Sequence, residues 1–139
     1  MERHEERFGI GPGDAVPHVA GQAFDASIID LWVPLANGAS VHLPVEDEVR
    51  SAPALLWDWL VASGCSHLFV TTALYEALLG LGPALLRPSR LRHLLTGGER
   101  VHKRPPAGLP FEVWTNYGPT ETTVLATSGV IAQAPTQDN

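Results

Sequence analysis

A short polar run near the carboxyl end of the chain holds the residues best suited to chemistry. It occupies residues 116–121 and contains a Gly-Pro pair that is typical of a tight turn. Thr120 offers a hydroxyl donor, Glu121 offers a carboxylate suited to Mg²⁺, and Tyr117 offers a flat aromatic face for a base. From the residue types alone, a surface turn with a helix cap is the simpler interpretation, and a ligand site is the alternative.

Asp25 is a second residue that could do chemistry. It opens a segment whose apolar residues recur at helical spacing, and Asn37-Gly38 gives a signal for the end of that helix. Asp25 could cap the helix that begins at Ala26, or its carboxylate could pair with the ammonium group of a substrate. The two roles are compatible, because a side chain at the start of a helix can face a cleft.

The elements that position these residues follow from the spacing of apolar runs and turn signals. Strands are predicted within residues 15–20, 40–43, 67–70, 91–95 and 111–114, and a final strand within 123–127. Helix-sized segments separate them, including residues 51–62 and a helix capped by Thr71 or Thr72. Alternating strands and helices predict an α/β fold with a mainly parallel sheet and helices on both faces.

Three polar segments each follow a predicted strand. They are Thr71-Thr72, residues 96–99 and residues 116–121. In open α/β sheets, ligands bind outside the carboxyl ends of the strands, near the point where the strand order reverses. The sequence therefore predicts that three separate loops converge on one ligand-binding edge.

Composition sets limits on the class of protein. The chain has 139 residues, suited to one domain, and a formal net charge of −6, which argues against a nucleic-acid-binding surface. A basic cluster within residues 87–104 is interpreted as a solvated face.

Cys65 is the only cysteine, so we expect it to be buried and the protein to be cytoplasmic. No apolar run approaches the roughly 20 residues of a membrane span, and the charged start does not resemble a secretion signal. The four tryptophans are expected in the core.

Four motifs resemble the adenylation domains of nonribosomal peptide synthetases, within the adenylate-forming superfamily. In order, they are residues 24–27 (Phe-Asp-Ala-Ser), 35–40 (Leu-Ala-Asn-Gly-Ala-Ser), 95–99 (Leu-Thr-Gly-Gly-Glu) and 117–121 (Tyr-Gly-Pro-Thr-Glu). The resemblance covers nearly all of residues 8–129 and implies a flavodoxin-like, substrate-binding subdomain. The expected division is a polar lead-in over residues 1–13, the subdomain over 14–129 and a tail over 130–139.

The resemblance also implies a nucleotide site. In that family the tyrosine of the last motif packs against adenine, the threonine contacts the α-phosphate and the glutamate helps to hold Mg²⁺. These roles pass to Tyr117, Thr120 and Glu121. Thr115 stands where the family usually has asparagine, a departure that affects one adenine contact. The other residues expected to border the adenine are Gly97, Gly98 and Glu99.

The family's amino-acid pocket can be carried across by motif in the same way. Asp25 would pair with the α-ammonium group, and no other lining residue is charged, so an apolar amino acid is expected. Leucine is the first choice, although Ile29 stands where leucine-activating members often have tryptophan. The expected lining is Asp25, Ala26, Ile29, Phe69, Leu95, Gly97, Asn116, Val124 and Leu125.

Other parts of that family's catalytic machinery do not occur among the 139 residues. No Ser/Thr/Gly-rich phosphate loop follows a strand, and the only lysine, Lys103, lies in a proline-rich loop. The chain is therefore expected to be an inactive part of an ATP- and Mg²⁺-dependent ligase, without a tightly bound cofactor. Its expected partners are the remainder of the adenylation domain and a phosphopantetheinylated carrier protein, with self-association through an exposed face. The alternatives are a stand-alone flavodoxin-like nucleotide or amino-acid binding module and a non-catalytic interaction protein.

Overall fold

Strands and helices alternate along most of the chain. The computed structural model describes residues 8–21, 24–118 and 126–135. The strands are β1 (Ala15–Pro17), β2 (Ser40–His42), β3 (His67–Thr71), β4 (His93–Gly97), β5 (Glu112–Tyr117) and β6 (Thr127–Val130). The helices are α2 (Ala26–Ala36), α3 (Asp47–Ser51), α4 (Pro53–Ser63), α5 (Thr72–Leu79) and the 3₁₀-helix η1 (Gly82–Leu86).

The strands pair in a mainly parallel arrangement. β1 pairs with β2, and β3, β4 and β5 pair in that order, all in parallel, while β6 is antiparallel to β5. The Ser66 N–H donates to the Ala15 carbonyl at 2.8 Å, which brings β1 beside the start of β3. The strands form two sheets, with the orders β1-β2 and β3-β4-β5-β6, and β1 lies beside β3. Read across this junction, the order β2-β1-β3-β4-β5 is the flavodoxin-like order, so the predicted α/β fold is confirmed.

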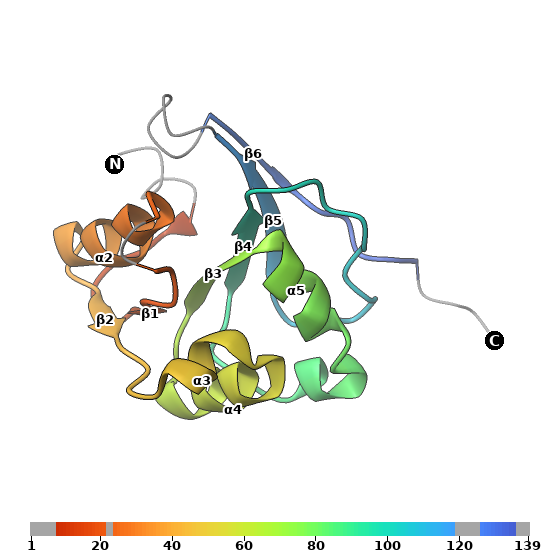
Figure 1. Ribbon diagram of the computed structural model, residues 1–139, viewed down its shortest axis with the longest axis horizontal. Helices are drawn as coiled ribbons and strands as arrows, with labels where there is room; N and C mark the ends of the chain where they lie inside the picture. The colour runs from red at the N-terminus through yellow and green to blue at the C-terminus, as the bar shows by residue number, and fades with distance from the viewer. Residues whose placement is uncertain (1–7, 22–23, 119–125, 136–139) are drawn as a thin grey trace.

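Alternate residues of the strands pack on opposite faces of the sheet. Leu68, Leu94 and Val113 belong to one buried cluster, which contains side chains of α4, α5 and η1. Phe69 and Leu95 face the second cluster, whose members include Phe8, Ile10, Val16 and Val33 of α2. In Figure 1, α2 lies on one side of β3 and β4, and α5 lies on the other. The helices therefore cover both faces, as a mainly parallel sheet requires.

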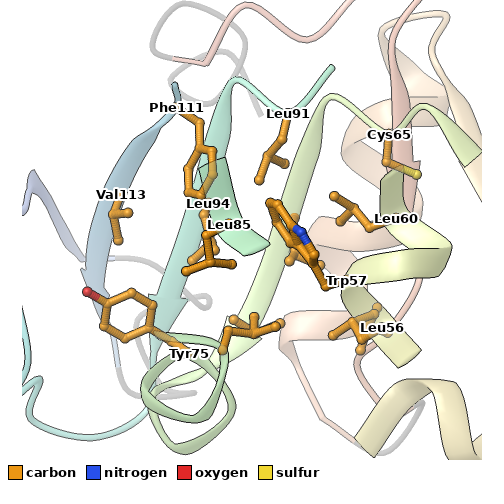
Figure 2. Close-up of a cluster of buried hydrophobic side chains, with 14 of the residues drawn as sticks. Leu56, Trp57, Leu60, Cys65, Tyr75, Leu85, Leu91, Leu94, Phe111 and Val113 are labelled. Carbon is orange, nitrogen blue, oxygen red and sulfur yellow. The ribbon is translucent and has the colours of Figure 1, made fainter. Parts of the chain in front are cut away.

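The larger cluster holds the helices against β3, β4 and β5. In Figure 2, Trp57 and Leu60 of α4 lie on one side of Leu85, and Val113 of β5 lies on the other. The ring centroids of Trp57 and Phe111 are 5.8 Å apart. The Trp57 indole N–H donates to the Ala84 carbonyl at 2.9 Å, so its one polar atom is satisfied. Cys65 is fully buried at the edge of this cluster, and burial raises the pKa of its thiol, as expected for a packing residue.

Helix ends agree with their sequence signals in most places. Thr71 caps α5, its hydroxyl accepting from the Leu74 N–H at 3.3 Å, and Gly64 ends α4 with φ 67°. Pro34 lies within α2, which continues to Ala36. The sequence signals did not predict α3 or η1. No helix in the described part of the chain is long and apolar enough to cross a membrane.

The apolar stripe of α2 points away from the core, contrary to expectation. Ile28, Trp32 and Leu35 are exposed, and Trp32 is 56% exposed, so the prediction of a core role for this tryptophan was wrong. The buried face instead carries Ile29, Asp30, Val33 and Pro34. Periodicity identified the helix but not which face lies inward, because both faces carry apolar residues. The exposed apolar residues of α2 form what we call the outer α2 stripe, and its members are Ile28, Trp32 and Leu35.

We expect Leu60→Ala to lower the free energy of unfolding by about 2–5 kcal/mol, because it removes a fully buried side chain and leaves a cavity. The matched control is Leu55→Ala on the same helix, where the side chain is 42% exposed and a change within about 0.5–1 kcal/mol is expected. Urea unfolding followed by circular dichroism measures both. Equal losses in the two variants would contradict the described orientation of α4.

Candidate functional site

A cavity of about 780 Å³ lies at the carboxyl edge of the parallel strands. This volume is within the range of small-molecule sites. The lining residues are Val19, Ala20, Gly21, Phe24, Asp25, Ala26, Ile29, Arg50, Ser51, Phe69, Val70, Thr71, Ala73, Leu74, Ala77, Gly97, Gly98, Glu99, Asn116 and Gly118.

The topology of the sheet explains why these segments meet. From β1 the chain passes through α2 to β2 on one side and then returns to β3 on the other, so the strand order reverses between β1 and β3. The segment after β1 and the carboxyl ends of β3, β4 and β5 all contribute to the cavity. The predicted convergence of the three loops after β3, β4 and β5 is confirmed at Thr71, Gly98 and Gly118.

The cavity brings together most of the expected amino-acid pocket that lies within the described residues. Leu95 is the exception, since it does not line the cavity and instead packs with Phe8, Val16 and Val33 in the second cluster. Val124 and Leu125 lie outside the described residues. The expected residues that do line it are Asp25, Ala26, Ile29, Phe69, Gly97 and Asn116.

The expected nucleotide residues divide in a similar way. Gly97, Gly98 and Glu99 line the cavity. Tyr117 ends β5 beside it and is 70% exposed, so its ring presents a free face next to the opening without forming part of the lining. The expected phosphate and Mg²⁺ residues, Thr120 and Glu121, lie outside the described residues. Within residues 8–21, 24–118 and 126–135, no group of three His, Cys, Asp or Glu side chains could hold a metal ion.

Asp25 occupies the N-cap position of α2 without acting as a cap. Its backbone is already helical, with φ −60° and ψ −26°, and its side chain makes no capping hydrogen bond. An N-cap residue normally has extended backbone angles, and these let its side chain reach the N–H groups of the first turn. The Asp25 carboxylate therefore lines the cavity without being committed to the helix end.

Asn116 is the most unusual polar residue of the lining. It is 7% exposed, and neither its amide nitrogen nor its amide oxygen has a partner within the described part of the chain. A buried amide without partners costs free energy, so such a group in a cavity indicates a place for a ligand or water. Most other walls near it are apolar, with Ile29 and Phe69 among them.

Gly97 is required where β4 approaches β5 beneath the cavity. A Cβ atom built on Gly97 would lie 2.6 Å from the backbone oxygen of Asn116, closer than real side chains come. Neighbouring Gly98 has φ 98°, a left-handed conformation that favours glycine. The two glycines thus fix the chain direction where β4 leaves the sheet and the lining begins.

Arg50 and Ser51 belong to the lining although sequence reasoning did not select them. They come from α3, whose acidic first turn and basic last turn match the helix dipole. That charge pattern was the available signal for the helix, but nothing in it indicates a cavity wall. The Arg50 guanidinium donates to the Pro44 carbonyl at 3.4 Å, and its buried Nε has no partner within the described residues.

Asp30 was also missed, because a charged residue within a helix is usually exposed. It is fully buried in α2, where its Oδ2 accepts from the Val19 and Ala20 N–H groups at 3.2 and 3.1 Å. Burial raises the pKa of this carboxyl group to about 7, against the lowering effect of the two hydrogen bonds. His18 Nδ1 lies 3.8 Å away, and burial, then the Arg50 guanidinium, lowers the pKa of that ring.

The basic cluster contacts acceptors of the chain itself. Arg87 pairs with Asp58 at 2.6 Å, and Arg92 pairs with Asp14 at 3.0 Å. Arg90 donates to the Gly13 carbonyl at 3.3 Å. These contacts agree with a solvated face and lie away from the cavity lining.

Comparison with known proteins identifies the family. The model of the family described as AMP-binding enzyme matches residues 1–139. The chain belongs to this AMP-binding enzyme family. One component of the linear gramicidin synthase of Brevibacillus parabrevis is 44% identical over 135 residues, which are 96% of this chain and 2% of that protein. The resemblance to nonribosomal peptide synthetase adenylation domains is thereby confirmed.

Solved structures of nonribosomal peptide synthetases share the fold of this AMP-binding chain. One, in an AMPPNP-bound form, matches with a TM-score of 0.78 and 26% identity over 98% of this chain and 15% of its own. Another, with four domains and bound to AMP and glycine, matches with a TM-score of 0.76 and 28% identity over 93% of this chain and 10% of its own. The chain thus spans a small part of the relatives that it matches.

The contact beneath the cavity of this AMP-binding chain gives a testable prediction. Gly97→Ala should lower the free energy of unfolding by about 1–3 kcal/mol, because the added methyl group forces β4 and β5 apart. Gly129→Ala in β6 is the matched control, since a Cβ atom there meets nothing within 4 Å. The control should be neutral or stabilising by about 0.4–1 kcal/mol. Chemical denaturation measures the free energy of unfolding of both variants. An unchanged value in Gly97→Ala would contradict the close approach of β4 and β5.

The buried carboxyl group gives a prediction about pH. The pKa of Asp30 is 3.8 in the unfolded chain and about 7 in the folded protein. Between these pH values the carboxyl group is protonated only in the folded state, so the free energy of unfolding falls as the pH rises. Asp30→Asn should remove this pH dependence. Burial lowers the pKa of His67 to about 4, so this ring titrates in the same pH range. Its effect on stability is present in both proteins and cancels in the comparison. The free energy of unfolding of both proteins, measured at several pH values, tests this difference. Parallel pH profiles of the two proteins would contradict a raised pKa of Asp30.

Proposed function

We propose that this chain forms the amino-acid- and adenine-binding subdomain of a nonribosomal peptide synthetase adenylation domain. The complete enzyme would convert an amino acid and ATP into an aminoacyl-adenylate and pyrophosphate. The proposed amino acid is apolar, with leucine as the first choice. The observation that carries the proposal is the cavity at the strand ends, because six of the residues that the family resemblance assigns to the amino acid line it together with Gly97, Gly98 and Glu99, which the resemblance assigns to adenine.

The geometry of Asp25 supports a role in binding the substrate ammonium group. Its carboxylate lines the cavity and makes no capping hydrogen bond to α2. A carboxylate in a partly apolar cavity attracts a cation, and the pair strengthens as water is excluded. The other charged groups in the lining are Arg50 and Glu99, which come from α3 and from the loop after β4. Asp25 lies beside Ala26 and Ile29, the apolar wall that would receive the side chain.

The character of the walls supports an apolar side chain in the substrate. Ile29 and Phe69 offer carbon surface, and burial of a leucine-sized group contributes about 1.5–3 kcal/mol. One methylene group discriminates by only roughly 1–3 kcal/mol, so isoleucine, valine and methionine should be accepted weakly. The unpartnered Asn116 amide would then be satisfied by the polar part of a ligand or by water.

The adenine side of the site rests on the loop after β4. Gly98, where a Cβ atom would meet nothing within 4 Å, leaves room for a flat base to approach the backbone, and the exposed ring of Tyr117 offers a surface for stacking. When bound, ATP would supply the adenylyl group, and Mg²⁺ would offset the phosphate charge. Thr120 and Glu121 are proposed to contact the α-phosphate and the metal.

The remaining parts of the reaction are proposed to come from outside this chain. Transfer to the α-phosphate needs prepositioned cations, and among the described lining residues only Arg50 carries a fixed positive charge. We propose that the remainder of the adenylation domain supplies these groups and that a phosphopantetheinylated carrier protein receives the product. The outer α2 stripe is the proposed contact with the rest of the enzyme, or between two copies of the chain alone.

The test is to graft residues 24–125 into a complete adenylation domain and to compare all proteinogenic amino acids by pyrophosphate exchange. We expect leucine to be preferred, with weaker activity for other aliphatic residues. The 139-residue chain alone is the negative control and should show no exchange. A preference for lysine, aspartate or glutamate would refute the apolar pocket.

Asp25→Asn in the same graft tests the ammonium contact. The amide keeps the size of the side chain and removes its charge. Loss of a desolvated charge pair typically costs about 2–5 kcal/mol, so kcat/KM should fall about thirtyfold or more. Undiminished exchange in this variant would remove Asp25 from the substrate site.

A further inference from the structure

The chain keeps a carboxyl group in its interior at a position that the proposed chemistry does not use. Asp30 is fully buried in α2, within a helix face otherwise made of Ile29, Val33 and Pro34. Burial of a carboxylate is costly, and an apolar side chain of similar size would usually be cheaper. The hydrogen-bond partners of such a buried carboxyl group offset this cost, so they indicate its role.

The carboxyl group of Asp30 accepts from two backbone N–H groups that lie beyond the end of β1. His18 makes the last backbone hydrogen bond of this segment to β2, donating to the His42 carbonyl at 2.9 Å. The N–H groups of Val19 and Ala20 follow and donate to Asp30 Oδ2 at 3.2 and 3.1 Å. Buried backbone donors need acceptors, and here one side chain replaces the missing strand. Asp30 thus holds the backbone of Val19 and Ala20, two residues that follow β1.

The two ends of this contact lie in different walls of the cavity. Val19 and Ala20 line it from the segment after β1, whereas Ala26 and Ile29 line it from α2. Asp30 directly follows Ile29 and lies just over one helical turn after Ala26, so its carboxyl group joins the helix wall to the loop wall. The separation of these two walls sets the width of the cavity at this end.

The surrounding charges leave the carboxyl group available as an acceptor. Among the described residues, the basic side chain within 4 Å is that of His18, and burial lowers the pKa of its ring, which favours the neutral form. Arg50 acts on His18 and donates to Pro44, not to Asp30. Asp30 Oδ1 has no partner within the described part of the chain. The hydrogen bonds to Val19 and Ala20 are therefore its main contacts.

We propose that Asp30 is a positioning residue that fastens the segment after β1 to α2 and thereby fixes the shape of the amino-acid end of the cavity. The inference rests on the proposed function for its substrate, but the hydrogen bonds themselves can be tested without one. Asp30 touches no ligand in this proposal. It acts through Val19 and Ala20 on one side and Ile29 on the other.

Hydrogen exchange of the 139-residue chain tests the contact directly. In the wild-type protein the Val19 and Ala20 amides should exchange at least about a hundredfold more slowly than in an unstructured peptide, although they lie outside the strands. In Asp30→Leu, which keeps the approximate size but offers no acceptor, their exchange should accelerate at least about tenfold. Amides of β4 should keep their protection. Unprotected Val19 and Ala20 amides in the wild type would overturn the proposal without any variant.

Two further variants separate positioning from general stability. Asp30→Asn retains a carbonyl oxygen that can accept both N–H groups and should restore most of the protection. Val33→Ala weakens the same buried face of α2 without touching the loop, so it should lower overall stability while the Val19 and Ala20 amides stay protected relative to their neighbours. Loss of protection in folded Asp30→Asn equal to that in Asp30→Leu would overturn the acceptor role.

Kinetics in a complete adenylation domain that carries a longer graft, residues 14–125, give the functional outcome, because this graft includes Val19 and Ala20 as well as Asp30. Asp30→Leu should raise KM for the amino acid at least about tenfold, with changes in kcat and in KM for ATP below about threefold, because only one end of the cavity is disturbed. Asp30→Asn should rescue this KM. Equal losses for both substrates would overturn the positioning role. If the wild-type graft itself is inactive, the proposed function fails, whereas the exchange result still decides the role of Asp30.

Discussion

The junction between β1 and β3 is the contact on which the rest of the structure depends. A backbone hydrogen bond from the Ser66 N–H to the Ala15 carbonyl joins the two sheets at this point. The Ser66 side chain strengthens it, since its hydroxyl also lies 3.3 Å from the Ala15 backbone nitrogen and oxygen. Beyond the junction the strands run apart, and the cavity occupies the space between the segment after β1 and the end of β3.

The same junction explains why the site combines rigid and adjustable parts. β3, β4 and β5 form a continuous ladder, in which Gly97 pairs with Thr71 on one side and Asn116 on the other, so the positions of these three residues are fixed by backbone pairing. The opposite wall has only the short β1–β2 pair and side-chain contacts from α2. Contacts such as those of Asp30 therefore matter more for that wall than for the sheet.

Much of the fold could be predicted from the sequence, because short apolar runs mark β3, β4 and β5 and strong end signals mark α4. The convergence of loops followed from parallel topology alone. The inward face of α2 could not be predicted, since Trp32 and Val33 have similar hydrophobicity and only tertiary packing distinguishes them. α3 was too short to show a period, so Arg50 was missed. Leu95, which was assigned by motif, packs with Phe8, Val16 and Val33, and its place in the amino-acid pocket stays a prediction.

Helix α2 carries two independent sets of residues on opposite sides. Ala26 and Ile29 face the cavity, while Ile28, Trp32 and Leu35 of the outer α2 stripe face away from it. A substitution in one set does not alter the surface of the other, so the helix can change what the cavity accepts while its outer surface keeps the same shape. Recombination of such segments between related enzymes then depends on two separate criteria, the cavity and the outer surface, and a match in one does not imply a match in the other.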